Sequence, residues 1–149
     1  MRTKRMLVAV LAVAGLAGCD TPYGVNRYAT VAVMPAPAQV LAVMRSAPGV
    51  DSAAYAPDTV SGRAVSPDSV ITFDYRGGAG VRGVLQFIRE GRGVLYTQHV
   101  GRMGEPPPQR EVDAALPVMR AIEGRLETLP GLAGLRSAVV QECPGVKCP

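Results

Sequence analysis

The sequence is poor in the residues that build enzyme centres. Its 149 residues include no tryptophan, two phenylalanines and a single histidine, His99. One histidine cannot form a metal cluster with a second one. The sequence also lacks the G-x-S-x-G motif of serine hydrolases and any carboxylate pair in a hydrolytic arrangement. We therefore predict a non-enzymatic protein with no catalytic residue, no metal ligand and no cofactor.

A hydrophobic run long enough to span a membrane is also missing. The longest apolar segment, Met6–Gly18, has 13 residues, whereas a spanning helix needs about 20. Three basic residues precede this segment, which carries no charge. A basic start, a short apolar run and small residues before a cleavage site are typical of a secretory signal peptide.

The apolar run ends in Leu16-Ala17-Gly18-Cys19, which resembles the lipobox of bacterial lipoproteins. The resemblance implies that residues 1–18 are a signal peptide, that Cys19 is acylated, and that the protein is anchored in the cell envelope facing the periplasm. A single acyl chain binds a bilayer only marginally, at about 0.8 kcal/mol per buried methylene. Two or three chains on Cys19 would give a stable anchor, so membrane lipid is the first expected partner.

The charge balance argues against a nucleic-acid partner. The net charge of +4 comes from 16 basic and 12 acidic residues, and three of the basic ones lie in the signal. The remaining chain is therefore close to neutral. A near-neutral domain lacks the basic surface that nucleic-acid binding requires.

Two cysteines, Cys143 and Cys148, remain after Cys19 is acylated. In an oxidising envelope, two cysteines this close are expected to form a disulfide, and Pro144-Gly145 supplies a turn between them. A redox pair or a metal site are the alternatives. Redox pairs favour C-x-x-C at the start of a helix, and a metal would need further ligands.

The domain organisation follows from these segments. Residues 1–18 are the signal, and residues 19–34 are predicted to hold the lipidated cysteine and a tether. Residues 35–149 are predicted to form a single α+β domain with the C-terminal disulfide. Within residues 19–34, the polar segment Asp20–Arg27 is the expected tether, reaching at most about 25 to 30 Å, and Tyr28–Met34 is a candidate strand.

The fold class follows from periodicity. Ile71, Phe73 and Tyr75 alternate with polar residues, as in a half-buried strand. Val81–Glu90 and Gly93–Val100 are expected to form a hairpin that pairs Phe87 with Tyr96. Further strands are predicted at Val50–Tyr55 and Leu135–Gln141, a loop at Ala56–Asp68, and helices at Ala38–Ala47 and Gln109–Leu129. The second helix contains Pro117, which predicts a kink or a helix that begins there. We expect an antiparallel sheet of three to five strands with two helices packed on one face.

Three local motifs have plain structural interpretations. Gly78, Gly80 and Gly83 match a G-x-G-x-x-G fingerprint, but no helix is predicted after it, so a strand connection is favoured over a nucleotide site. His99 is interpreted as an ordinary strand residue. Pro106-Pro107-Pro108 is expected to stiffen the approach to the long helix rather than to bind a groove.

The function predicted from these features is that of a membrane-anchored envelope lipoprotein that acts by contact with another envelope protein. The alternative is a periplasmic module that binds a small ligand or metal on the second face of the sheet. A hydrolase is the third possibility.

Overall fold

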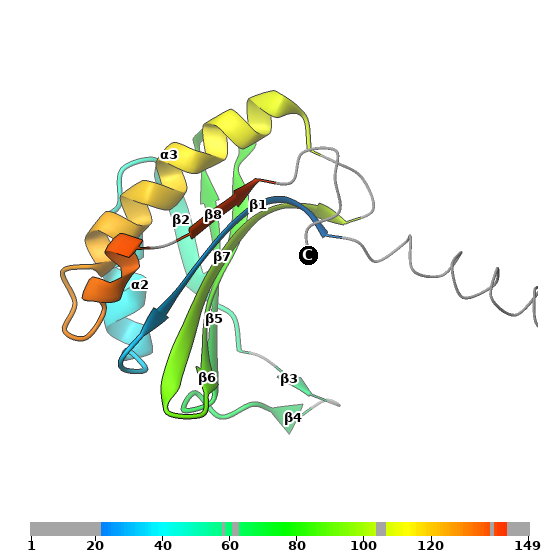
Figure 1. The fold of residues 1–149 in the computed structure, drawn as a ribbon. Helices are drawn as coiled ribbons and strands as arrows, with labels where there is room; N and C mark the ends of the chain where they lie inside the picture. Colours follow the sequence, from blue (N-terminus) through cyan, green and yellow to red (C-terminus); the bar gives the residue numbers. More distant parts are fainter. Residues whose placement is uncertain (1–21, 58, 61–62, 104–106, 138, 143–149) are drawn as a thin grey trace, which may run out of the picture.

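The fold is an antiparallel sheet with two helices on one face, as predicted (Figure 1). The computed structural model describes residues 22–57, 59–60, 63–103, 107–137 and 139–142. The elements are β1 Pro22–Val31, α2 Pro37–Arg45, β2 Val50–Tyr55, β3 Thr59–Val60, β4 Arg63–Ala64, β5 Val70–Gly77, η1 Gly78–Gly80, β6 Arg82–Glu90, β7 Gly93–Met103, α3 Gln109–Leu126, η2 Ala133–Ser137 and β8 Val139–Glu142.

The strands β5, β6 and β7 form the predicted meander. The β6–β7 register pairs Phe87 with Tyr96 and Arg89 with Val94, as expected. Gly91 occupies the turn with φ 59°, a conformation that side-chain-bearing residues rarely adopt and that two-residue hairpin turns require. The rings of Phe87 and Tyr96 lie 5.4 Å apart and are tilted by 56°, within the range of favourable aromatic pairs.

The core lies between the sheet and the two helices. Alternate residues of each strand point toward the helices, so Phe73, Leu85, Phe87 and Tyr96 are fully buried. The helix α3 contributes a buried stripe at spacings of three and four residues, namely Val112, Ala115, Met119, Ile122 and Leu126. We call the sheet face on this side the inner face and the opposite one the outer face.

Pro117 lies inside α3 and does not begin it. The helix runs unbroken from Gln109 to Leu126, so the expectation of a helix starting at Pro117 is wrong. Pro117 is exposed, and its ring removes one hydrogen bond on the solvent side of the helix. Water can satisfy the freed carbonyl there, which explains why the helix tolerates the proline.

The predicted tether is wrong for most of its length. Pro22–Arg27 form the first half of β1, which pairs with β7 along ten residues and with β8 on its other side. Pro22–Val31 therefore belong to the folded sheet, although the domain was predicted to start at residue 35. Its first strand contributes Val25 and Ala29 to the core, which explains why a polar-looking segment folds into the sheet.

Two further segments differ from expectation. The predicted loop Ala56–Asp68 contains the short pair β3–β4, and the first part of the predicted strand Leu135–Gln141 is the 3-10 helix η2. Within the described residues, the main sheet has six strands in the order β2-β5-β6-β7-β1-β8. It exceeds the predicted three to five because both β1 and β8 join it.

The lipobox residues Leu16, Ala17, Gly18 and Cys19 lie outside the described residues, as do Cys143 and Cys148. The anchor and the disulfide therefore stay predictions. In the part of the chain that the structure describes, no helix combines the length and apolarity needed to cross a membrane.

The buried Phe87–Tyr96 pair makes a stability prediction. Phe87→Ala should lower the free energy of unfolding by about 3 to 5 kcal/mol, because it leaves a cavity in the core between the sheet and the helices. Arg92→Ala, at the exposed hairpin tip, should change it by less than about 0.5 kcal/mol. Urea unfolding followed by circular dichroism measures both. Equal losses would show that Phe87 does not lie in the core.

Candidate functional site

Three polar features of the domain are candidates for a functional site. One is a buried network on the inner face, another is a pocket at the start of α3, and the third is a hollow on the outer face. They differ in which side chains they expose to solvent and in how close those side chains lie to one another.

The buried network links three strands to α3. Arg27 of β1 donates from Nε to Oε1 of Glu123 on α3 at 2.6 Å. The Tyr96 hydroxyl contacts both Oε1 of Gln98, at 2.7 Å, and Oε1 of Glu123, at 3.3 Å. Gln98 then donates from Nε2 to the hydroxyl of Tyr75 at 2.8 Å. All five side chains are buried, so each polar group depends on the others for its hydrogen bonds.

The two tyrosine hydroxyls of the network are protonated at neutral pH. Burial raises the pKa of the Tyr75 hydroxyl well above its ordinary value. Burial also raises the pKa of Tyr96, and the nearby Glu123 carboxylate raises it further. Both hydroxyls therefore stay protonated, and neither is available as a nucleophile.

Gly83 is required by this network. A Cβ at Gly83 would lie only 2.2 Å from the ring of Tyr75, so a side chain there would displace the tyrosine. The last glycine of the G-x-G-x-x-G pattern thus has a packing role. Gly78 and Gly80 lie in η1, which connects β5 to the strand β6 and not to a helix. The predicted strand connection is confirmed.

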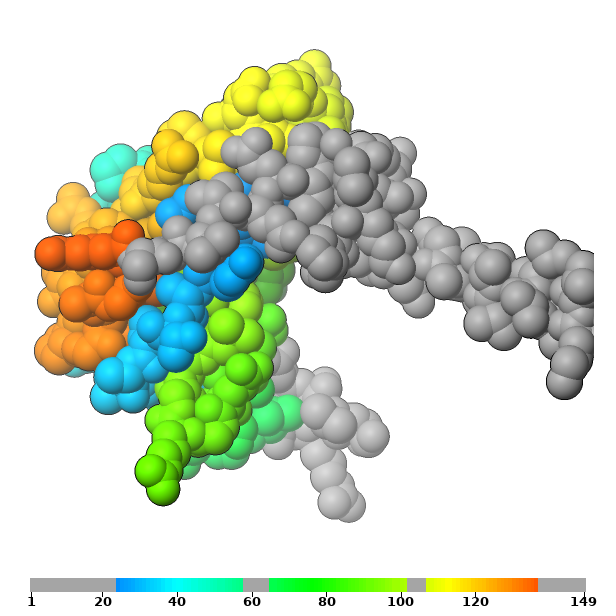
Figure 2. Space-filling model, viewed as in Figure 1, coloured from blue at the N-terminus to red at the C-terminus, as the bar shows by residue number. Residues whose placement is uncertain are grey.

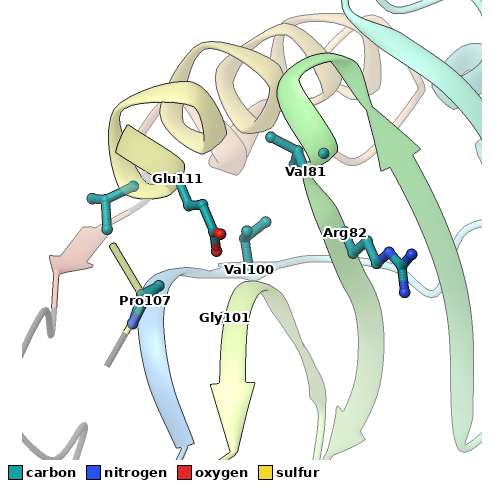
Figure 3. A pocket seen from close by; sticks show the side chains of 8 residues that line it. Val81, Arg82, Val100, Gly101, Pro107 and Glu111 are labelled. Carbon is teal, nitrogen blue, oxygen red and sulfur yellow. The ribbon is translucent and has the colours of Figure 1, made fainter. Parts of the chain in front are cut away.

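The helix-end pocket lies between the start of α3 and the β5–β6 connection (Figure 3) and has a volume of about 470 Å³. Glu111 projects into it from α3, whereas the guanidinium of Arg82 points away. Val81, Val100, Pro107 and Val112 supply apolar walls. A single carboxylate against apolar walls is not the paired arrangement that glycoside hydrolysis uses.

The outer hollow is the third feature and collects the most varied side chains. It has a volume of about 490 Å³ and is lined by residues of β2, β5, β6 and β7. Its ionisable and polar side chains are Ser52, Asp74, Arg76, Arg82 and His99. Asp74, Arg76 and Arg82 are exposed and His99 is half-buried. We take this hollow as the candidate site because it brings a histidine and several charged groups together at an open surface.

His99 is held by a neighbour on the outer face. Its Nδ1 lies 2.6 Å from Oδ1 of Asn26 on β1, and because that oxygen only accepts, the histidine donates. Burial lowers the pKa of His99 below its ordinary value of 6.5. The ring is therefore neutral at pH 7, and it contributes no positive charge to the hollow.

The outer hollow does not form a Ser-His-Asp relay. Ser52 is in β2, Asp74 in β5 and His99 in β7, with β6 between the last two. Adjacent strands lie about 4.8 Å apart, so Asp74 and His99 are about 10 Å apart at the backbone and Ser52 is farther away. Among the described residues, no group of three or more histidine, cysteine, aspartate or glutamate side chains can hold a metal ion. The arrangement is better suited to binding than to hydrolysis.

Most of the residues that form these three features were not predicted from the sequence. His99, which was interpreted as an ordinary strand residue, shares the outer hollow with Asp74. Pro106 of the proline run lies outside the described residues, whereas Pro107 and Pro108 directly precede α3. The Arg27–Glu123 pair and the two arginines of the hollow were not predicted. For the arginines, a signal exists in the symmetric positions of Arg76 and Arg82 about the glycine-rich turn.

No family model, curated protein or solved structure matches the chain. Its candidate site is therefore defined by the geometry of its own residues.

The Arg27–Glu123 pair predicts strong coupling between two residues 96 positions apart. Glu123→Leu should cost about 3 to 5 kcal/mol, because it leaves a buried guanidinium without its counter-charge. The double variant Arg27→Met with Glu123→Leu should recover most of that loss. Glu127→Leu is the control, since Glu127 pairs with the exposed Arg136 and should cost less than about 1 kcal/mol. A double variant as unstable as Glu123→Leu would refute the coupling.

His99 predicts an acid-sensitive contribution to stability. Its folded-state pKa lies below the ordinary 6.5, so the unfolded chain binds more protons as the pH falls. The stability contribution of neutral His99 is thus complete above the ordinary pKa and is lost as the pH falls through the folded-state pKa. Unfolding measured from about pH 7.5 to about pH 5.5 should show this loss in the wild type and a smaller one in His99→Gln. Identical pH profiles would contradict the assignment.

Proposed function

We propose that this chain is a lipid-anchored protein of the bacterial cell envelope that acts by binding another envelope protein through the outer face of its sheet. The observation that carries the proposal is the one-sided cover of the sheet. Both α2 and α3 pack on the inner face (Figure 1), and neither covers the outer face.

The outer face has the composition of a contact surface. Its central residues alternate with the buried core positions of β6 and β7 and are half-buried, with apolar and polar side chains interspersed, namely Val84, Gln86, Ile88, Leu95 and Thr97. Tyr28 on β1 is 40% exposed. Non-obligate interfaces are likewise mixed in polarity and enriched in aromatic residues. The curvature of the sheet places this face on the inside of a bend (Figure 1), which favours a convex partner surface.

The position of β1 sharpens the anchoring proposal. If Cys19 carries the lipid, only Asp20 and Thr21 separate it from Pro22, the first residue of β1. That leash spans at most about 10 Å, far less than the predicted tether. The domain would then stay against the membrane, and its partner would be a membrane protein or a protein bound at the membrane surface.

The end of the sheet that is opposite Pro22 would point away from the membrane. Because β1 begins at Pro22 and ends at Val31 beside Val94, the tip of the β6–β7 hairpin lies at the end opposite Pro22. Figure 2 shows this tip projecting from the body of the domain. An anchored domain would therefore present its outer face along the length from the membrane to the hairpin tip.

A small-ligand module is the second candidate, and the outer hollow favours it. Its volume of about 490 Å³ falls in the range of small-molecule sites, about 300 to 1,000 Å³. A ligand that binds there would raise the melting temperature of the purified protein. The protein-contact function does not require such a ligand.

In-cell crosslinking tests the contact function. A photoreactive amino acid at Thr97, in the middle of the outer face, should give one reproducible adduct with a membrane-associated protein. The same group at Arg120, exposed on α3, should not. Replacing the lipoprotein signal with an ordinary cleavable signal should weaken the Thr97 adduct, because tethering raises the effective concentration. Equal adducts from both positions, or none from Thr97, would contradict the proposal.

A further inference from the structure

Two arginines are placed side by side on the outer face. Arg76 of β5 and Arg82 of β6 are direct cross-strand partners at the last paired position before the β5–β6 turn. Like charges directly opposite each other destabilise a sheet. Within the part of the chain that the structure describes, neither guanidinium forms an ion pair. The sheet therefore carries an unfavourable pair that its own side chains do not neutralise.

The arginine pair borders open space rather than packed protein. Both residues line the outer hollow, and both also line a second space of about 380 Å³ beside the turn. In the outer hollow, Asp74 is the one carboxylate and His99 is neutral, and in the second space Asp51 is the one carboxylate. Each space therefore has two guanidinium groups against one carboxylate. Guanidinium groups present planar arrays of N–H donors that match the oxygens of phosphate. The chemistry of the pair is that of a phosphate site.

The pair also lies at the end of the sheet where the chain enters. The registers place Gly83 beside Val100 and Val100 beside Val25, so Arg82 is level with Gly24, two residues from Pro22. Two strand spacings and two residues along the strand put Arg82 about 12 Å from Pro22 at the backbone.

We propose that Arg76 and Arg82 bind the phosphate of a phospholipid headgroup in the leaflet that holds acylated Cys19. This inference rests on the proposed lipid anchoring. The short leash brings the Pro22 end of the sheet to the membrane surface, where headgroup phosphates are dense. The two contacts together, lipid at Cys19 and headgroup at the arginines, fix the orientation of the domain. The outer face then stands upright from the membrane.

The test uses the full chain as purified from cell membranes in detergent. Native mass spectrometry with added phosphatidylglycerol should show a phospholipid bound to the wild type. The double variant Arg76→Gln with Arg82→Gln should bind it about tenfold to thirtyfold more weakly, as expected when two basic residues are removed from a lipid contact. The matched control, Arg89→Gln with Arg92→Gln, removes two arginines at the β6–β7 turn, at the opposite end of the sheet, and should bind as the wild type does.

Three outcomes overturn the headgroup site. Equal binding by the arginine variant and the wild type would do so, as would equal loss in the matched control. Displacement of the phospholipid by inorganic phosphate at millimolar concentration would show a free-phosphate site instead. A melting temperature at or above that of the wild type in the Arg76→Gln, Arg82→Gln variant shows that lost binding is not lost folding, because that variant relieves a like-charge pair.

The denatured mass of the same samples separates this inference from the anchoring. A mass with acyl groups on Cys19 and arginine-independent phospholipid binding would refute the headgroup site while the anchor stands. A mass without acyl groups would refute the anchor, whatever the arginines bind.

Discussion

The ion pair between Arg27 and Glu123 sets the position of the first strand relative to the helix layer. Arg27 lies in the middle of β1 and Glu123 in the last turns of α3, and both are buried. Burying two charges costs several kcal/mol each, and only close pairing with further hydrogen bonds offsets that cost. Tyr96 supplies such a bond to the carboxylate. The pair therefore tolerates little displacement of β1 along α3, and it favours one register of the sheet under the helix.

This constraint has a consequence for the anchored end of the domain. A strand that begins a domain is commonly frayed unless it is tied down. Here β1 lies between β7 and β8 and is fixed to α3 through Arg27. A load applied at the lipid would pass through two residues into a strand that is paired on both sides. The proposed anchor would thus hold the whole sheet rather than a loose terminal segment, which is what a defined orientation at the membrane requires.

Local patterns predicted the central meander well and the first strand poorly. The alternation of Ile71, Phe73 and Tyr75 is a property of neighbouring residues, and so is the hairpin turn at Gly91. Arg27 is buried because of a partner 96 residues away, and no local pattern can show that. Glu123 is likewise buried because of its distant partner Arg27, and its place in an amphipathic helix does not reveal this. The cross-strand position of Arg76 and Arg82 depends on the β5–β6 register, which the glycine-rich connection left undefined.

Both faces of the sheet carry charged residues in unusual positions. The inner face buries them, and the outer face places two like charges side by side. On the inner face, charged and hydroxyl groups are buried, and Arg27, Glu123, Tyr96, Gln98 and Tyr75 form hydrogen bonds with one another, although Nη1 of Arg27 has no partner among the described residues. On the outer face, Arg76 and Arg82 repel each other with no compensating ion pair among the described residues. Proteins keep uncompensated departures of this sort mainly where they serve function. The inner charges are thus paired with each other inside the fold, whereas the arginine pair faces open space, where the proposed phospholipid phosphate would supply a counter-charge.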